Sequence, residues 1–313
     1  MLSVTAIVVN WRQPEITLRC LRSLERLEYP CQVIVIDNGS NDHSVAYLTQ
    51  HCPNVEVLRL PTNRGFGSAC NYGIIYALQD TACEYVLLLN NDVILHPQAL
   101  TELVKAAQVL PNAGILGPKV YYNDGTNRIW YAGARRRWAV LAATDTGRGQ
   151  IDHGQFNQTR RVDYVFGAAM FVRRTVFEQI GLFDENFFLY LEDLDFCLRA
   201  QNAGFTLWFV PQAYVWHEGS ASIAHEAALY RYHIARSTTY FLRKHISSKH
   251  VPLAIAFWLL VAVRTIAVET LRGDIKKTLW YWPGFVAGLA VPLPASIMSP
   301  LGFGAQIWTT GRE

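Results

Sequence analysis

Four short runs of apolar residues within residues 1–90 constrain the fold of this chain more than any other feature. Helices are expected between the runs, where apolar residues recur at helical spacing and Pro14 stands at the first helix start. Strands alternating with helices are typical of a parallel sheet with right-handed crossovers. The sequence therefore predicts the α/β fold class with a mostly parallel central sheet. The expected strands are residues 4–9, 33–36, 55–58 and 85–89, and the expected helices are residues 14–27, 43–50 and 68–79.

Polar or glycine-rich residues follow each of these predicted strands. The carboxyl ends of parallel strands meet at one edge of a sheet, where open α/β sheets bind ligands. We therefore expect four side chains to lie close together there: Asn10, Asp37, Asn63 and Asp92. A carboxylate at this edge suits Mg²⁺ or Mn²⁺, which proteins usually hold with one or two carboxylates and substrate phosphates. Taken alone, residues 90–92 are equally typical of a polar turn after a strand.

The glycines Gly65 and Gly67 raise the question of a dinucleotide-binding fold. They follow the third predicted strand rather than the first, and Cys70 stands where that fingerprint has its last glycine. We therefore interpret the two glycines as residues that let the backbone approach a diphosphate or form a tight turn.

The order of the predicted elements changes after Asp92. Helices are expected over residues 97–109, 174–180 and 222–243. The triplet at residues 135–137 is all arginine, which favours a solvated hairpin end over a functional cluster. Short strands are expected at residues 114–121, 128–132, 162–166, 167–172, 205–210 and 213–216.

Two neighbouring acids, Glu192 and Asp193, open a further predicted helix after an aromatic loop at residues 181–190. The positive end of the helix dipole favours ionised carboxylates at that place, and a proton acceptor working near neutral pH has to be ionised. Acids that only begin a helix are the commoner case. Asp195 and Arg199 are four residues apart, so we assign them a structural ion pair along the helix.

The histidines and cysteines give no strong metal signal. His217 follows a predicted strand, where a structural role is usual and metal ligation is the alternative. The six cysteines lack CxxC spacing and several lie in apolar runs, so we expect reduced, mostly buried thiols in a cytosolic protein. The residues after Met1 lead directly into a strand, and no signal peptide is expected.

The C-terminal part differs from the rest in charge. Residues 231–277 carry a net charge of +7 and the remainder −4, while the total of +3 gives no support for nucleic acid as a partner. The 13 consecutive apolar residues at 251–263 are fewer than the ~20 that span a bilayer. The nearby Trp258, Trp280 and Trp282 fit helices that lie in a membrane interface, with a buried packing helix as the alternative.

Taken together and in this order, these motifs resemble the family 2 glycosyltransferases, which have the GT-A nucleotide-diphospho-sugar-binding fold. Within that family the chain is most similar to the rhamnosyltransferase-like branch of polysaccharide assembly enzymes. The resemblance covers roughly residues 3–245. It rests on residues 7–11, 35–40, 63–67 with Asn71, 90–92, 167–170, 183–185 and 192–195.

The resemblance implies two parts of the chain. Residues 1–245 would form the GT-A domain, with a nucleotide-binding half at residues 1–95 and an acceptor-binding half at 96–245. Residues 246–313 would form a helical extension. Residues 246–290 of it would contact the membrane peripherally, at the cytoplasmic face.

The resemblance also implies roles for single residues. Asp37 would accept a hydrogen bond from the nucleobase, and Asp92, with His217, would hold Mg²⁺ or Mn²⁺ on the diphosphate. The first acid of the family's metal-binding motif is here Asn90, so metal binding without nucleotide should be weak. Asp193 would be the catalytic base, with Glu192 orienting the acceptor or the base. The donor-binding residues would be Val9, Asn10, Asp37, Asn63, Gly65, Asn71, Asn91 and Asp92.

The implied function is a metal-dependent, inverting transfer of a sugar from a nucleotide-diphospho-sugar, with dTDP-rhamnose as the expected donor. The acceptor would be a saccharide or a lipid-linked saccharide, and residues 144–159 are expected to form a mobile loop near it. One base and in-line displacement at the anomeric carbon give inversion. The alternatives are a UDP-sugar-dependent member of the same family and a non-catalytic saccharide-binding protein on this fold. A nucleotidyltransferase is disfavoured, because residues 10–13 lack the glycine- and arginine-rich loop.

Overall fold

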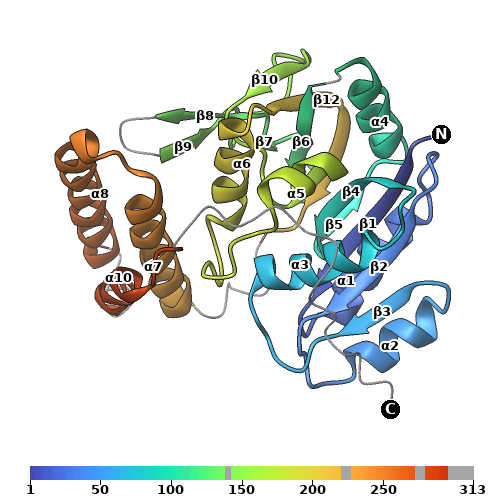
Figure 1. The fold of residues 1–313 in the computed structure, drawn as a ribbon, viewed down its shortest axis with the longest axis horizontal. Coiled ribbons are helices and arrows are strands. Elements are labelled where there is room, and N and C mark those ends of the chain that lie inside the picture. The colour runs from blue at the N-terminus through green and yellow to red at the C-terminus, as the bar shows by residue number, and fades with distance from the viewer. Residues whose placement is uncertain (111, 138–141, 220–226, 272–278, 295–313) are drawn as a thin grey trace.

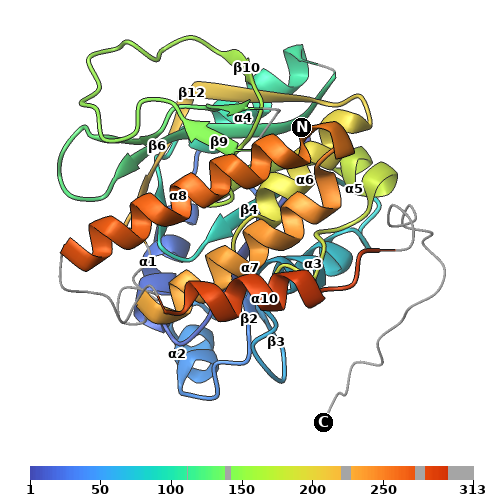
Figure 2. The same cartoon turned by 90° about the vertical axis from the view of Figure 1, so that its left-hand side faces the viewer.

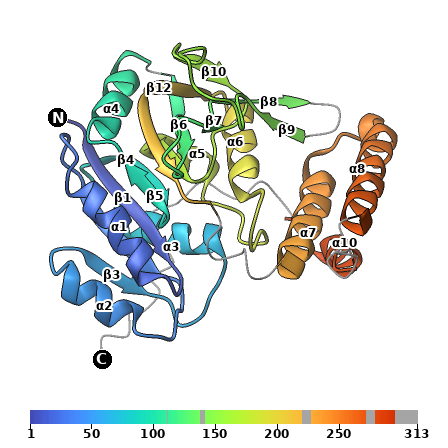
Figure 3. The ribbon, with the colours of Figure 1, turned by 180° about the vertical axis from the view of Figure 1, so that it is seen from behind.

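The structure, a computed structural model, describes all residues except 111, 138–141, 220–226, 272–278 and 295–313. Its centre is a 10-stranded mixed sheet whose main path runs in the order β10-β12-β6-β11-β4-β1-β2-β3. Helices α3, α5 and α6 cover one face of the sheet and α1 and α4 cover the other (Figures 1 and 3).

The first half of the chain alternates strands and helices as predicted. Strand β1 pairs in parallel with β2 and β4, and β2 pairs in parallel with β3, which confirms the expected parallel arrangement. The elements are β1 Ser3–Asn10, α1 Pro14–Leu24, β2 Gln32–Asp37, α2 Ser44–His51, β3 Glu56–Arg59, α3 Phe66–Ala77 and β4 Cys83–Asn90.

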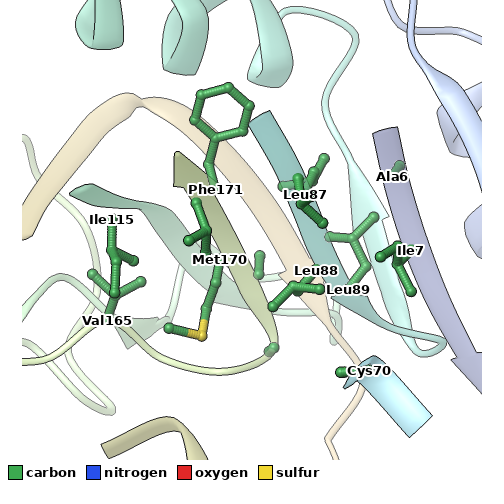
Figure 4. Packing of buried hydrophobic residues seen from close by; sticks show 14 of the residues in the cluster. Ala6, Ile7, Cys70, Leu87, Leu88, Leu89, Ile115, Val165, Met170 and Phe171 are labelled. Atoms are coloured by element: carbon green, nitrogen blue, oxygen red, sulfur yellow. The ribbon is translucent and has the colours of Figure 1, made fainter. Parts of the chain in front are cut away.

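The apolar residues of β4 lie at the middle of the core. Leu88 stands beside Ile7 of β1 on one side and Met170 on the other, and all three are buried (Figure 4). Gly73 lets α3 approach this layer, because a Cβ there would lie 2.7 Å from the Cγ2 of Ile7. All six cysteines are free thiols and five are buried, as predicted.

The second half of the chain completes the sheet from the other side. Strand β11 lies antiparallel between β4 and β6, and β12 pairs in parallel with β6 and antiparallel with β5. Strands β8 and β9 form a separate hairpin. The elements are β5 Val93–Leu95, α4 Ala99–Val109, β6 Ala113–Tyr122, β7 Ile129–Tyr131, β8 Ala134–Arg137, β9 Ala142–Asp145, β10 Arg160–Val162, β11 Ala169–Arg173, α5 Arg174–Ile180, α6 Glu192–Asn202 and β12 Thr206–His217.

Two strand predictions in this half are wrong. The strand expected over residues 162–166 ends at Val162, and the residues after it turn toward the centre of the domain. The two strands expected at residues 205–210 and 213–216 are one continuous strand, β12. Its pairing with β6 is irregular between Val210 and Tyr214, where Pro211 has no N–H to donate to the ladder.

The arginine triplet is not the solvated hairpin end that its sequence suggests. The Arg136 side chain is buried, and the Arg136 backbone N–H donates to the Asp163 carboxylate at 3.0 Å. Alternate residues of a strand point to opposite faces, so a hairpin that lies on the domain buries the middle arginine and leaves Arg135 exposed.

Helices at the C-terminal end form a layer beyond the sheet domain. They are α7 Ala227–His245, the short helix η1 Ser248–His250, α8 Val251–Leu271 and α10 Tyr281–Ala290. Helix α7 lies against the domain, with α10 and α8 on its outer side (Figures 1 and 2). A Cβ at Gly284 would lie 2.3 Å from the backbone O of Tyr232, so glycine lets α10 pack directly on α7. Residues 222–226 of the expected helix lie outside the described residues.

Helix α8 is longer than the apolar run predicts, and most of it is exposed. Within the described residues, one segment, Ser248–Val268, is long and apolar enough to cross a membrane, and only 6% of it is buried. The alternative of a buried packing helix is therefore wrong. The helix exceeds the apolar run because it continues through Arg264 to Leu271.

Candidate active site

A cavity of about 770 Å³ lies where the carboxyl ends of the parallel strands meet the second half of the chain. Strand ends, the start of α3, the loop before α6, the end of β12 and one side of α7 all contribute to its wall. The lining residues are Val9, Trp11, Asn38, Asn63, Gly65, Phe66, Asn90, Asn91, Asp92, Trp130, Arg148, Tyr164, Phe166, Gly167, Ala168, Phe188, Leu189, Tyr190, Leu191, Glu192, Asp193, His217, Leu229, Tyr230, His233 and Ile234.

Asn10 and Asp37 lie behind this wall rather than in it. Both are fully buried, and the Asn10 amide donates to the Asp37 carboxylate at 2.8 Å. The Asp37 carboxylate also accepts from the Ser40 hydroxyl and from the Ser40 backbone N–H. These bonds hold the loops after β1 and β2 together, and the contact of Asp37 with a nucleobase stays a prediction.

Asn38, which we did not single out, is also buried but lines the cavity next to Asp37. Its side chain donates to the Asn63 carboxamide at 3.0 Å and accepts from the Arg64 backbone N–H at 3.0 Å. Gly65 has a φ of +87°, and a Cβ there would lie 2.1 Å from the backbone O of Phe188. The positive φ of Gly65 is typical of a tight turn, and the absence of a Cβ lets the Phe188 backbone lie against it.

The two remaining asparagines among the expected donor-binding residues, Asn71 and Asn91, lie in different places. Asn71 is buried outside the lining and clamps the loop before α6, because its carboxamide donates to the Phe183 carbonyl and accepts from the Phe183 N–H, both at 2.9 Å. Asn91 lines the cavity, and its amide donates to the Thr17 hydroxyl at 3.1 Å.

Asp92 and His217 meet at the bottom of the cavity. Pairing of β5 with β12 sets His217 opposite Val93, the residue after Asp92. The Nε2 atom of His217 lies 3.1 Å from Oδ1 of Asp92, and both residues are buried. Neither ring nitrogen of His217 makes an aligned hydrogen bond to another described residue.

This pair fits a divalent ion whose other ligands come from elsewhere. A buried imidazole without a hydrogen-bond partner beside a carboxylate is a suitable partial ligand set for Mn²⁺ or Mg²⁺. Among the described residues, no three or more histidine, cysteine or acidic side chains are grouped so that they could hold a metal ion by themselves. Substrate phosphates and water would therefore have to complete the coordination.

Asp193 is held by three donors at the opposite side of the same cavity. Its Oδ2 accepts from the Tyr164 hydroxyl at 2.5 Å and from the Gly167 N–H at 2.9 Å, and its Oδ1 accepts from the Leu194 N–H at 2.8 Å. A Cβ at position 167 would lie 2.6 Å from Oδ2, so glycine is required there. Burial raises the pKa of Asp193, and the three hydrogen bonds oppose that rise.

Glu192 lines the cavity next to Asp193, and its pKa is raised. Burial, and next the charge of Asp193, raise the pKa of Glu192 to about 8. Its Oε2 has no hydrogen-bond partner among the described residues. The expectation that the helix dipole keeps both acids ionised is therefore wrong for Glu192, because desolvation outweighs the partial charge of the helix end.

The turn before α6 is strained. Tyr190 and Leu191 have φ values of 70° and 68°, in the left-handed region that residues with a Cβ rarely adopt. Tyr190 packs edge-on against Tyr230 of α7, and the Leu189 carbonyl accepts from the Ser237 hydroxyl of α7 at 2.8 Å. Helix α7 thus holds the turn that aims Glu192 and Asp193 into the cavity.

Asp195 pairs with Arg199 at 2.8 Å, as predicted, and is also bound by α7. Lys244 lies 2.7 Å and His245 lies 2.6 Å from its Oδ1. Burial alone would raise the pKa of Asp195, but the His245 hydrogen bond and the three cationic partners hold it far below its ordinary value of 3.8. This buried cluster fixes α6 to α7.

Sequence reasoning missed several lining residues, among them Tyr164, Trp130, Arg148 and Tyr230. Tyr164 is 29 residues from Asp193 and was expected in a strand, so no local pattern connects the two. Arg148 comes from the connection that we expected near the acceptor; it lines the cavity, and the place of the acceptor stays a prediction. The roles of all these residues in binding and catalysis stay predictions.

The fold and this cavity define a glycosyltransferase of the GT-A class. Residues 5–181, more than half of the chain, match the family described as glycosyl transferase family 2, and the protein belongs to that family. It is similar to the N-acetylglucosaminyl-diphospho-decaprenol L-rhamnosyltransferase of Mycobacterium tuberculosis, with 30% identity over 69% of this chain and 75% of that protein. It is also similar to the dTDP-rhamnosyl transferase RfbF of Shigella flexneri, with 25% identity over 88% and 94%. The chain is thus a rhamnosyltransferase-like member of the family.

Solved structures share the fold at low sequence identity. The mannosyltransferase PcManGT from Pyrobaculum calidifontis, solved with GDP-Man and Mn²⁺, has a TM-score of 0.58 at 14% identity, over 92% of this chain and 87% of that one. The S. aureus protein TarS, residues 1–349, has a TM-score of 0.56 at 15% identity, over 92% and 81%. These matches confirm the GT-A fold expected from the sequence.

Replacing Asp195 with asparagine tests the buried ion cluster. We expect the free energy of unfolding at pH 7 to fall by about 3–5 kcal/mol, because the cationic partners lose their counter-charge inside the protein. The pKa of Asp195 is lower in the folded chain than the ordinary 3.8, so its contribution is complete above about pH 4 and is lost as the pH falls further. Denaturant unfolding at several pH values would measure both effects.

The control is Asp124→Asn, which breaks an exposed aspartate–arginine pair of the same four-residue spacing. It should leave the unfolding midpoint nearly unchanged. Equal losses for the two variants would contradict a specific role for the Asp195 cluster.

Proposed function

We propose that this glycosyltransferase moves a sugar from a nucleotide-diphospho-sugar to a saccharide acceptor with inversion at the anomeric carbon. The observation that carries the proposal is that Asp92 with His217, and Asp193 with Glu192, line one cavity. A diphosphate-binding group and a proton acceptor are thereby within reach of one bound substrate pair.

The proposed donor is dTDP-rhamnose. Its support is the similarity to relatives named as rhamnosyltransferases, one of them a dTDP-rhamnosyl transferase. Asn38, Asn63 and Asn91 would line the nucleotide side of the cavity, and Asn10, Asp37 and Asn71 would support them. A UDP-sugar is the second candidate donor, since a structural neighbour of the same fold was solved with UDP.

Asp92 and His217 would hold Mg²⁺ or Mn²⁺. When bound there, the ion supplies positive charge that neutralises the departing nucleotide diphosphate. Asn90 lines the cavity beside Asp92 but carries no charge, so the protein alone offers a weak site. Nucleotide and metal are therefore expected to bind together.

Asp193 would take the proton from the acceptor hydroxyl as that oxygen attacks the anomeric carbon. The Tyr164 hydroxyl and the Gly167 N–H fix the orientation of the carboxylate and favour its ionised form. Glu192, with its raised pKa, would be protonated and donate a hydrogen bond to a substrate oxygen. One ionised carboxylate acting as base supports inversion, because no covalent nucleophile is needed.

A non-catalytic saccharide-binding protein on this fold is the competing function. Such a protein has no need of a buried, hydrogen-bonded carboxylate facing the same cavity as an Asp–His pair. Hydrolysis of a nucleotide sugar that depends on Mn²⁺ and stops with a chelator would favour the enzyme.

The proposed acceptor is a lipid-linked saccharide at the cytoplasmic face of the membrane, with α8 and α10 in peripheral contact with the bilayer. Apolar side chains on both helices are exposed, among them Leu260, Val263 and Trp282. Patches of this kind mark interaction surfaces, and basic residues nearby, such as Arg264, add attraction to anionic lipids. A relative named for a decaprenol-linked acceptor supports the same idea.

Replacing Asp193 with asparagine should separate binding from chemistry. We expect the transfer rate to fall by roughly 10²–10⁴-fold, because the amide cannot take the acceptor proton. The dissociation constant for the nucleotide sugar should change little, since the donor side of the cavity is untouched. Glu84→Gln, an exposed acid on β4, is the control. Transfer by the asparagine variant at the unchanged rate would remove Asp193 from the mechanism.

Placing a charge on the exposed face of α8 tests the membrane contact. In the full-length chain, Leu260→Glu should weaken binding to vesicles with anionic lipids by about tenfold or more, because a buried leucine contributes ~1.5–3 kcal/mol. Val109→Glu, at an exposed valine at the end of α4, should leave binding unchanged. Co-sedimentation with vesicles measures both. Equal binding of Leu260→Glu and the unsubstituted chain would refute the contact through α8.

A further inference from the structure

The cavity contains one arginine or lysine side chain among its described lining residues. That side chain is Arg148, and the same wall carries the acids Asp92 and Asp193. A cavity with this balance repels anions except where a cation, fixed or bound, faces them. Arg148 is therefore the fixed group in this wall that can attract a negatively charged part of a substrate.

Arg148 is held in position without being shut away from solvent. Its Nη1 lies 2.8 Å from Oδ2 of Asp145, and its guanidinium lies 5.1 Å from the centre of the Trp130 ring. The Arg148 side chain remains 52% exposed, whereas that of Asp145 is 18% exposed. A guanidinium has five N–H donors in a rigid fork, so an ion pair with Asp145 leaves capacity for a second anion.

Arg148 stands apart from the Asp92–His217 pair. The Trp130 ring lies between them, with its edge-on contact to His217 at 4.7 Å between centroids. The charge of Arg148 also acts on Tyr230 of α7, where it opposes the rise that burial causes in the tyrosine pKa. Arg148 thus faces the α7 side of the cavity, and α7 carries α10 on its outer surface.

We propose that Arg148 binds the diphosphate that joins the acceptor saccharide to its lipid. This inference rests on the proposed function, in which the donor diphosphate is neutralised at Asp92 and His217. A second diphosphate in the same cavity then needs its own cation, and Arg148 provides one in a wall shared with α7, the helix on which α10 packs. Arginine suits this task because its fork matches two phosphate oxygens at once.

The test compares two probes that differ only in the phosphate. One is N-acetylglucosamine joined to a decyl chain through a diphosphate, and the other is decyl N-acetylglucosaminide. Binding is measured by calorimetry on the full-length protein, with saturating dTDP and Mg²⁺ to occupy the donor site. We expect Arg148→Gln to raise the dissociation constant of the diphosphate probe about tenfold or more and to leave that of the phosphate-free probe unchanged.

Two further variants are controls, one for the shape of the cation and one for its position. Arg148→Lys retains a positive charge beside Asp145 but loses the fork, so its dissociation constant should lie between those of the unsubstituted protein and Arg148→Gln. Arg161→Gln, at an exposed arginine of β10 outside the cavity, should bind both probes normally. Thermal unfolding of each variant checks that it is folded.

Other outcomes would overturn the inference. Equal binding of the diphosphate probe by Arg148→Gln and the unsubstituted protein would show that the guanidinium only supports the loop. A raised dissociation constant for dTDP, with the probe unaffected, would assign Arg148 to the donor. Failure of the proposed function would instead appear as no turnover of any nucleotide sugar by the unsubstituted protein, whatever the two probe affinities are.

Discussion

Parallel strands buried on both faces place their functional polar groups at their ends, and this constraint organises the whole molecule. Val9 of β1 pairs with Asn90 of β4, and Asn10 pairs with Asp37 of β2, so the three strands finish at nearly the same level. Apolar packing along the strands sets that level. The second half of the chain adds its own groups to the same edge when β12 pairs with β5 and sets His217 beside Asp92.

The catalytic helix depends on α7 as much as on the sheet. Asp195 and Asp184 both bind Lys244, and the turn at Tyr190 and Leu191 is held against α7. Removing α7 would take Lys244 from two buried carboxylates and His245 from Asp195, and would release a strained turn. The helical layer is therefore part of the site: α7 lines the cavity with Tyr230 and His233, while α10 and α8 cover its outer side.

The sequence predicted the parts of the structure that depend on local pattern. Strands β1 to β4 and the acids at the start of α6 carry strong periodic or compositional signals. Contacts made between distant segments left no such signal: Tyr164 reaches Asp193 across 29 residues, and Arg148 enters the cavity from a polar connection. The raised pKa of Glu192 escaped prediction for the same reason, because burial follows from packing that a helix-end motif does not encode.

The central claim is that the ends of separate segments form one cavity that binds a nucleotide-diphospho-sugar together with a metal ion. Thermal unfolding with a panel of nucleotide sugars, each with and without Mn²⁺, tests it most directly, because a ligand that binds only the folded state raises the unfolding temperature. We predict that dTDP-rhamnose together with Mn²⁺ raises the unfolding temperature more than the nucleotide sugar or the metal ion alone. In Asp92→Asn, the additional rise caused by Mn²⁺ should disappear. No shift with any nucleotide sugar, or an equal shift in Asp92→Asn, would contradict the account.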